Sequence, residues 1–509
     1  MALRQNCMIA GFLICIATAG QAEWRRFETA HFIIYSEGDD RRVTDLATDL
    51  ESIDGLMRMA TGLRPGQKAV KVRIYEMGDE GAVQAARGQI GSGVAGFYSS
   101  NALGPFAVTT RKAYSATGSF TSRIILHHEY AHHFMLQYFP ATYPGWYREG
   151  FAELIGATKF LDDGRLAYGF PAKYRGDTIN FDWVSMRDIL LTPPDKMRKW
   201  DVYGQGWAMT HYLTFNPARA KQLRQYLGAI NAGKSSESAA AAFGDLDALN
   251  REAHLYLTRG QFEYRPVKVP IASQVIEKIT TLGPGEAALV PETIAFDDDD
   301  LRAYRKEAAR ERERKRREDV LRRVAAKAAR YPADPFAWRL LAQMQYAAGN
   351  HLAAGISADR LLALQPASVP GLTIKSLSLS RSTAGAEQAT RLRQTAEARA
   401  LAVRANKADP DDPMAYIAFY ESYRAAGAAV PANAIDGLMA AVEKLPSNVT
   451  VRQMLVDEYI RQQNWASAMR ALLPIANSTH DTPLRQAARE KMAMLQSNLA
   501  GRPATKPVP

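Results

Sequence analysis

Apolar and polar positions follow two different patterns along the first part of the chain. The segments His31–Ser36 and Val70–Glu76 are rich in β-branched and aromatic residues with partial alternation, which indicates strands. Between them, Arg41–Leu63 carries apolar residues at three- and four-residue spacing and predicts an amphipathic helix. A glycine-rich stretch, 88–100, leads into a further predicted strand over Phe106–Arg111. We therefore expect strands and helices to be mixed in the N-terminal region.

Helical spacing dominates after this strand. Ser119–Phe139 predicts a helix, with Ser119 or Thr121 as its N-cap and Pro140 as its stop. Further helices are predicted over Glu149–Thr158, Val202–Leu213 and Ala218–Ile230.

The chain becomes almost wholly helical from Leu301 onward, and its pattern repeats. Pro332 and Pro366 are 34 residues apart, and Trp338, Ala342 and other residues between them resemble a tetratricopeptide (TPR) repeat. Two looser copies follow over 412–446 and 455–472. Small residues at the repeated alanine positions would let paired helices approach closely. An irregular helical bundle is the alternative interpretation.

Positive charge is concentrated in one segment. Lysines and arginines number 64 against 53 aspartates and glutamates, a net charge of +11. Most of the excess lies in 302–330, where Glu and Arg mix at helical spacing and favour a solvated helix. Contact with an anionic lipid or envelope polymer is the alternative for this helix. Because the two signs nearly balance elsewhere, we expect no nucleic-acid partner.

The first 22 residues have the layout of a secretory signal. Arg4 precedes an apolar run over 8–19 and small residues up to Ala22, after which we expect cleavage. The run is shorter than the roughly 20 residues of a membrane span. We expect an exported chain, periplasmic or secreted, without a transmembrane span; retention by an uncleaved anchor is the alternative. Because Cys7 and Cys15 are the only cysteines, the mature chain has no cysteine nucleophile or disulfide.

Four of the nine histidines lie within the seven residues 127–133. Of these, His128 and His132 are one helical turn apart and share a helix face. Glu129 follows the first, which completes a His-Glu-x-x-His pattern. Such a pair can chelate one Zn²⁺, and the adjacent glutamate can act as general base toward a zinc-activated water. Because so short a pattern also arises by chance, the neighbouring residues decide what it means.

A catalytic zinc needs a third protein ligand and one open position. The metzincin spacing is excluded, because Met135 and Tyr138 stand where it requires Gly and His. Downstream, Glu149 follows His132 by 17 positions and opens a predicted helix, and Glu153 lies one turn further on the same face.

The segment over about residues 27–260 resembles the gluzincins, zinc metallopeptidases of the peptidase MA clan. The resemblance rests chiefly on these two helices. Aminopeptidases of this kind carry an E-G-F-A helix whose glutamate is the third zinc ligand. By this resemblance Glu149 is the third ligand and Glu153 orients a ligating histidine. The resemblance also implies that Phe106–Arg111 is an edge strand to which a peptide substrate adds.

A peptidase also needs a hydrogen-bond donor for the oxyanion of its tetrahedral intermediate. Tyr203, Trp207 and His211 follow one another at four-residue steps, in a Y-G-Q-x-W segment that resembles the helix after the zinc site in bacterial relatives. Tyr203 is the first candidate and His211 the second. Packing of an aromatic stripe into the core is the alternative for each.

The sequence thus predicts an α+β zincin-like catalytic domain over 23–265, a connector over 266–300, an all-α TPR-like helical repeat domain over 301–500 and a disordered tail over 501–509. The expected function is an exported zinc metallopeptidase with one Zn²⁺ per chain, acting on a peptide or protein substrate. Its repeats would recruit the substrate or a protein partner. Two alternatives remain: a catalytically degenerate peptidase fold that serves as a binding scaffold, and a zinc hydrolase for another kind of substrate.

Overall fold

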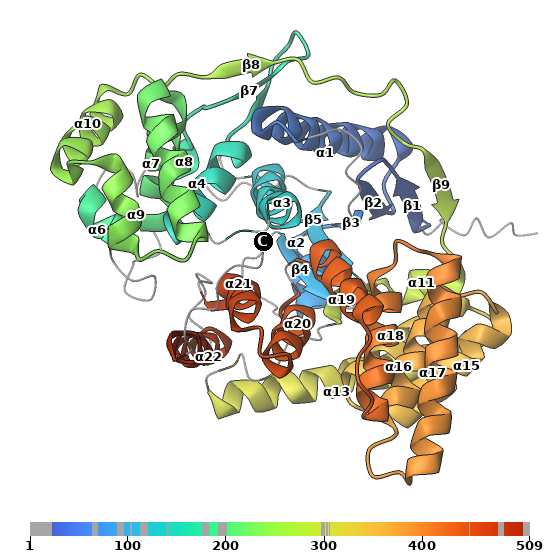
Figure 1. Cartoon of the computed structure of the whole chain (residues 1–509). Coiled ribbons are helices and arrows are strands. Elements are labelled where there is room, and N and C mark those ends of the chain that lie inside the picture. Colours follow the sequence, from blue (N-terminus) through green and yellow to red (C-terminus); the bar gives the residue numbers. More distant parts are fainter. Residues whose placement is uncertain are drawn as a thin grey trace, which may run out of the picture.

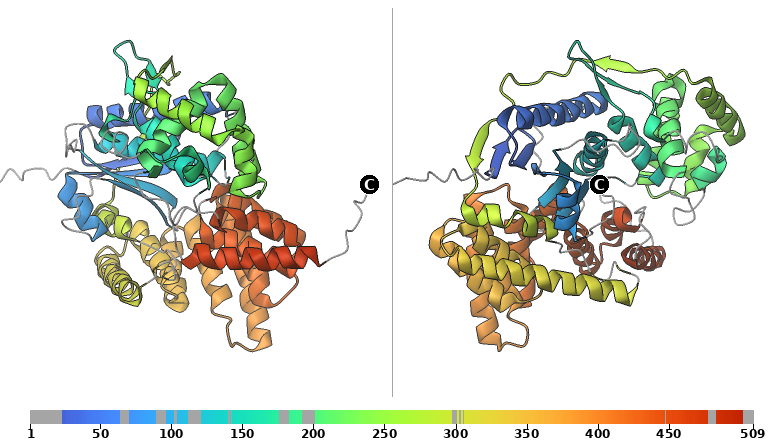
Figure 2. Two further views of the ribbon diagram at one scale, coloured as in Figure 1. Left: turned by 90° about the vertical axis from the view of Figure 1, so that its left-hand side faces the viewer. Right: turned by 180° about the vertical axis from the view of Figure 1, so that it is seen from behind.

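The structure is a computed structural model, and it describes residues 23–63, 70–88, 96–101, 104–111, 121–139, 141, 143–175, 183–191, 201–296, 301, 304, 306–446, 448–476 and 483–501. The predicted signal, most of the glycine-rich stretch, Ser119, Pro140 and nearly all of the tail lie outside these residues. In Figure 1 the N-terminal sheet and its helices (blue to green) lie above the C-terminal helices (yellow to red), and both views of Figure 2 show the same separation. No helix in the described part of the chain is long and apolar enough to cross a membrane.

The N-terminal region is built on a mixed sheet with the strand order β4-β5-β3-β2-β1-β9. Its central strands β2, β3 and β5 are parallel, whereas β4, β1 and β9 pair antiparallel with their neighbours. These strands are β1 (Arg25–Glu28), β2 (Phe32–Ser36), β3 (Val72–Met77), β4 (Phe97–Asn101), β5 (Gly104–Thr110) and β9 (Lys278–Thr281). The three strands predicted from the sequence are confirmed as β2, β3 and β5.

The prediction that Phe106–Arg111 forms an edge strand is wrong. Residues Phe106–Arg111 fall in and just after β5, which lies between β3 and β4 and is hydrogen-bonded on both sides. The edge is β4, formed by the end of the glycine-rich stretch. Because β4 pairs antiparallel with the outer side of β5, the strand that directly precedes α3 in the sequence is not the outermost strand of the sheet.

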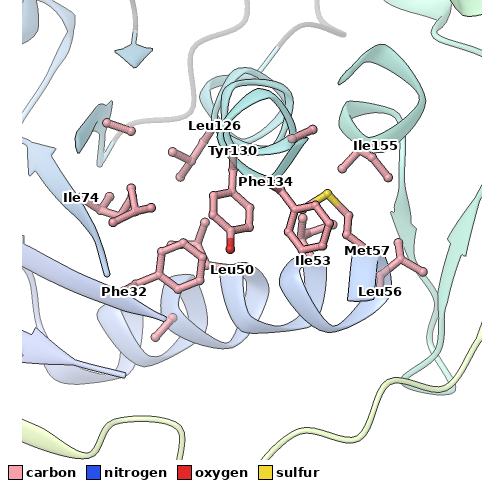
Figure 3. Packing of buried hydrophobic residues seen from close by; sticks show 14 of the residues in the cluster. Phe32, Leu50, Ile53, Leu56, Met57, Ile74, Leu126, Tyr130, Phe134 and Ile155 are labelled. Atoms are coloured by element: carbon pink, nitrogen blue, oxygen red, sulfur yellow. The ribbon is translucent and has the colours of Figure 1, made fainter. Parts of the chain in front are cut away.

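Both faces of this sheet are covered. On one face, Phe32 and Ile74 pack against helices α1 (Asp40–Thr61) and α3 (Ser122–Tyr138), and Figure 3 shows Tyr130 and Phe134 of α3 directed onto α1. On the other face, alternate strand residues such as Tyr75 pack against α2 (Glu80–Arg87), α11 (Pro284–Ala288) and α12 (Val290–Ala295). Because each such buried side chain contributes about 1.5–3 kcal/mol, α3 is held firmly on the sheet.

The predicted connector over 266–300 contains regular elements, although residues 268–277 form neither helix nor strand. It supplies β9 to the main sheet, and its first residues belong to β8 (Arg265–Val267), which pairs with β7 (Leu166–Tyr168). Its last helices, α11 and α12, cover the sheet. The sequence did not predict these elements, because each is only three to six residues long and too short to show a clear pattern of apolar positions.

A second group of helices packs beside α3. It comprises α4 (Gly145–Gly156), α6 (Met186–Leu191), α7 (Gly206–Phe215), α8 (Pro217–Asn231), α9 (Ser236–Ala240) and α10 (Leu246–Arg259), with a short strand β6 (Lys159–Phe160) paired to β7. Trp146, Met209 and Tyr226 are among the residues of its core. This group carries the third predicted ligand and the candidate oxyanion donors.

The C-terminal region consists of antiparallel helix pairs, as the repeat pattern predicted. These helices are α13 (Glu307–Arg330), α14 (Pro335–Ala347), α15 (His351–Leu364), α16 (Val369–Arg381), α17 (Gln388–Ala408), α18 (Pro413–Ala426), α19 (Ala432–Lys444), α20 (Val449–Arg461), α21 (Trp465–Ala476) and α22 (Pro483–Ala500). The repeated small residues Ala342, Ala354 and Ala358 are fully buried where helices meet. The pair α16/α17 did not stand out in the sequence, because α17 is 21 residues long where α15 has 14, and this breaks the 34-residue period.

The arginine-rich segment over 302–330 contains the whole of α13, which is a solvated helix with ion pairs along its surface. Arg314 pairs with Glu311 at 2.7 Å, one turn away on the same face. Val320 and Val324 form the narrow buried side of the helix. The prediction of a solvated helix is confirmed.

Candidate metal centre

The histidine pair lies on one face of α3. Thr121 caps the helix by accepting a hydrogen bond from the Ile124 N–H at 3.3 Å, so the cap is the second of the two predicted residues. The Nε2 atoms of His128 and His132 are 3.1 Å apart. Because the helix fixes the four-residue step, this convergence follows directly from the sequence.

The two flanking histidines have structural surroundings. His127 packs near Phe160, and burial lowers the pKa of its imidazole to about 3. His133 Nδ1 lies 2.9 Å from the Tyr98 hydroxyl, and burial lowers its pKa to about 4. Both rings are therefore neutral at physiological pH and lie away from the pair.

Glu149 reaches the pair from α4. Its Oε2 lies 3.2 Å from His132 Nε2 and 3.5 Å from His128 Nε2. Its other oxygen accepts a hydrogen bond from Arg148 at 3.0 Å. Arg148 thereby directs Oε2 toward the two imidazoles, a role that the sequence analysis missed although this arginine precedes Glu149 directly.

Glu153 lies behind the pair, one turn further along α4. Its Oε1 is 3.3 Å from His128 Nδ1 and accepts hydrogen bonds from Arg175 at 2.7 and 3.0 Å. Although burial disfavours its ionisation, His128 and Arg175 hold the pKa of Glu153 below its usual range. This is the position expected of a carboxylate that orients a ligating histidine. Arg175 was missed, because no pattern links it to Glu153 across 22 residues.

A glycine contact brings Tyr203 to the same place. A Cβ at Gly150 would lie 2.2 Å from the Gly206 carbonyl oxygen, and one at Gly206 would lie 2.6 Å from that of Trp146. Helix α4 and the start of α7 therefore touch backbone to backbone. Just before this contact, Asp201–Gln205 form a single π-helical turn, a feature common near functional sites.

Tyr203 is carried by this turn and faces the site. Its ring centroid is 6.2 Å from that of His128, and the Arg175 guanidinium lies 4.7 Å from its centroid. Burial, followed by the charge of Glu149, raises the pKa of the Tyr203 hydroxyl to about 12. The hydroxyl is therefore protonated near neutral pH and able to donate a hydrogen bond.

His211 is not brought to the site. It is fully buried, with Nε2 2.8 Å from the Gly169 carbonyl oxygen and Nδ1 2.9 Å from the Tyr256 hydroxyl. Its ring stacks on Phe215. The alternative given for it, an aromatic stripe packed in the core, describes its surroundings, and Trp207 is likewise fully buried.

Glu129 lies beside the pair and is half-buried. Its carboxylate is not one of the three converging ligand groups. Burial and, secondarily, the charge of Glu129 raise the pKa of the Tyr98 hydroxyl on the edge strand β4. Glu129 therefore lies on the side of α3 nearest the sheet edge.

The distances of this group fit a zinc ion. Ligand atoms about 2.0–2.1 Å from a tetrahedral zinc are about 3.3–3.4 Å from one another. The two Nε2 atoms and Glu149 Oε2 are separated by 3.1, 3.2 and 3.5 Å. His128 Nδ1 and Glu149 Oε1 are held by other residues, whereas the two Nε2 atoms and Glu149 Oε2 all lie within 3.5 Å of one another. Two imidazoles and a carboxylate are a donor set that suits zinc.

A second group, His31, Glu51 and Asp54, also brings three potential ligand atoms together. Its carboxylates already have partners within the fold. Glu51 accepts from the Thr29 hydroxyl at 2.6 Å, and Asp54 accepts from the Tyr130 hydroxyl at 2.7 Å. This network ties α1 to the back of α3 and leaves the histidine pair as the stronger metal candidate.

Known proteins give little further guidance. No family model and no curated protein matches the sequence. Similar solved structures include a TPR protein, TTC0263, from Thermus thermophilus, with 18% identity over 36% of this chain and 92% of that chain at a TM-score of 0.32. MamA from Desulfovibrio magneticus has 17% identity over 41% of this chain and 99% of its own, at a TM-score of 0.23. Because both scores are low, the repeat fold rests on the helix pairing described above.

Proposed function

We propose that this chain is a zinc-dependent metallopeptidase whose metal is held by His128, His132 and Glu149. The observation that carries the proposal is the convergence of their three ligand atoms at the mutual distances of a tetrahedral zinc site, beside Glu129. A zinc ion held there would supply Lewis-acid chemistry, which makes a water molecule acidic and polarises a carbonyl group.

The remaining roles fall to residues of the chain. Glu129 accepts the proton of the attacking water and passes it to the leaving amine. Tyr203 donates a hydrogen bond to the oxyanion, since its hydroxyl is protonated near neutral pH. β4 is the outermost strand on its side of the sheet within the described part of the chain, and its main-chain groups would pair with an extended peptide substrate. Residues 1–22 would export the chain, and the repeats would recruit a substrate or partner.

The test uses the mature chain from Glu23. We expect one zinc per chain, and we expect Glu129→Gln to lower peptide hydrolysis by a factor of about 10²–10⁴ while zinc is retained. Glu318→Gln, on the exposed surface of α13, is the matched control. Unchanged hydrolysis in Glu129→Gln, or a protein without stoichiometric zinc, would overturn the proposal.

Two other functions are separated by the same measurements. If the chain is a catalytically degenerate scaffold that acts through its repeats, neither the unaltered mature chain nor Glu129→Gln would hydrolyse peptides. A zinc hydrolase for another substrate would hold zinc and lack activity on peptides. We favour the peptidase, because the metal ligands, Glu129, Glu153 and Tyr203 all occur together.

A further inference from the structure

A row of aromatic rings crosses the face of the sheet that α2 covers, and it ends at Arg87. The rings are those of Tyr35, Tyr75, Phe106 and Phe97, from β2, β3, β5 and β4 in that order across the sheet. Neighbouring ring centroids are 4.8, 6.1 and 6.1 Å apart. The Arg87 guanidinium lies 4.6 Å from the centroid of Phe97, the last ring. Because β4 is the outermost strand on this side of the described sheet, Arg87 lies at the sheet edge.

Arg87 has an aromatic neighbour there but no polar one. It is half-buried in the last turn of α2, and it forms no ion pair or hydrogen bond with any residue that the structure describes. A cation in a last helical turn stabilises the helix dipole, but this does not explain why the guanidinium lies over Phe97. Burial disfavours the charged form and lowers the pKa of Arg87. Its five N–H donors are therefore not used by the described fold.

Two charged groups of the described chain act on Arg87. Glu129 attracts it, and Arg316 of α13 repels it. Arg316 is itself paired with Glu313 at 2.6 Å. The charge of Glu129 also acts on His128, so this carboxylate lies between the candidate metal centre and Arg87. In the proposed reaction Glu129 serves as a base, and it is not an ion-pair partner of Arg87.

An extended peptide that adds to β4 would present alternate side chains to the two faces of the sheet. The strand itself shows this alternation, because Phe97 packs on the α2 face whereas the Tyr98 hydroxyl meets His133 of α3 at 2.9 Å. Residues directly opposite each other on paired strands have Cβ atoms about 4.5–5.5 Å apart on the same face. The side chain opposite Phe97 would therefore lie beside Arg87. The side chains before and after it would face α3.

We propose that Arg87 selects peptide substrates that carry an acidic side chain at the position opposite Phe97. Guanidinium groups bind carboxylates through paired, charge-assisted hydrogen bonds, which a neutral amide cannot match. An acidic residue one position away would point to the other face and lose this contact. This inference rests on the proposed peptidase function and names the class of substrate on which it acts.

The test begins with the unaltered mature chain from Glu23 and no variant. The substrate is an equimolar mixture of short acetylated and amidated peptides, in which Ala, Leu, Phe, Lys, Glu and Gln occur in random order. Mass spectrometry locates each cleaved bond. We expect glutamate to be enriched about tenfold over glutamine at one position relative to that bond, the size of one charge-assisted hydrogen bond partly exposed to water. The two adjacent positions should show no such enrichment.

Variants are then compared on a matched pair of peptides with glutamate or glutamine at the selected position. Arg87→Gln should lower the ratio of the two kcat/KM values about tenfold. Arg87→Lys keeps the charge without the paired donors and should retain part of the preference. Arg41→Gln, exposed on α1, is the control and should keep the ratio of the unaltered chain. Because each ratio is measured within one preparation, it does not depend on the fraction of folded enzyme.

Cleavage with no preference for glutamate at any position would overturn this inference and leave the peptidase function standing. So would an Arg87→Gln ratio equal to that of Arg41→Gln. If no peptide in the mixture is hydrolysed, the peptidase function fails and the substrate assignment fails with it. A glutamine-containing peptide that ends in a free carboxylate at the selected position tests the other source of negative charge. If it is hydrolysed as fast as the glutamate peptide, the assignment to an acidic side chain is wrong.

Discussion

Arg175 contacts two of the side chains that surround the candidate metal centre. It donates to Glu153, which holds His128 Nδ1, and it lies over the ring of Tyr203. Arg175 is therefore a positioning residue that fixes an imidazole and a phenol with one guanidinium.

We expect Arg175→Gln to weaken zinc binding about tenfold, because outer partners of metal ligands contribute about 10–100-fold to affinity. Competition with a chelator of known affinity measures this directly, without an activity assay. Arg165→Gln, whose ion pair with Asp163 is exposed, is the control. Equal zinc affinity in the two variants would leave Arg175 without the proposed role.

Tyr203→Phe isolates the hydroxyl group. If it donates to the oxyanion, kcat should fall by a factor of about 10²–10³, while KM and zinc content stay close to those of the unaltered chain. Steady-state kinetics with a peptide substrate checks this. A higher KM with an unchanged kcat would show instead that the ring only binds substrate.

Residues at short sequence distance were the predictable part of this site. The 3.6-residue period of an α-helix determines how His128, Glu129 and His132 lie relative to one another. The E-G-F-A motif points to Glu149. Arg175 and His211 were not predictable, because their partners come from other segments. Tyr203, Trp207 and His211 follow one another at four-residue steps. The π-helical turn nevertheless gives His211 different surroundings from those of Tyr203.

At the scale of elements, the contact between α4 and α7 determines where Glu149 lies. Gly150→Ala would place a methyl group 2.2 Å from the Gly206 carbonyl oxygen, so the two helices must separate. We expect a loss of about 1–3 kcal/mol in the free energy of unfolding, with weaker zinc binding. Denaturant unfolding and a zinc titration measure the two effects.

The matched control is Gly228→Ala on α8, where the new methyl group would meet nothing within 4 Å. Because glycine costs about 0.8–1 kcal/mol relative to alanine in a helix, this variant should be equally stable or more stable. If both variants behaved alike, helix propensity rather than the close contact would explain the result.

Elements were predictable where their own pattern was long. The helices α1, α3 and α8 match their predicted ranges within a few residues. The order of the strands in the sheet was not predictable, because strand pairing depends on which segments meet in space. This is why β5 was taken for the edge and β9 for part of a connector.

At the scale of the molecule, the repeats are continuous with the sheet they support. Glu292 of α12 is 5% exposed and pairs with Lys327 of α13 at 2.6 Å. Leu289 and Phe296 pack with Leu340 of α14 in one core. The boundary predicted near residue 301 therefore passes through a packed interface.

We expect a chain that ends at Phe296 to melt well below the full chain, because it exposes this core and removes partners of a buried carboxylate, which costs about 1–3 kcal/mol. A chain that ends at Ala348 keeps α13 and α14 and should retain most of the melting temperature of the N-terminal part. Thermal unfolding followed by circular dichroism compares them. Equal melting temperatures for the two truncated chains would contradict the shared core.

The pairing of β1 with β9 also sets the order of events during synthesis. Arg25 pairs with Thr281, about 250 residues later in the chain. At about 5–20 residues per second, a ribosome needs roughly 12–50 seconds to deliver the second strand after the first. Until then β1 has a neighbour on one side only, so the sheet that supports α3 cannot reach its final form before more than half of the chain has been made.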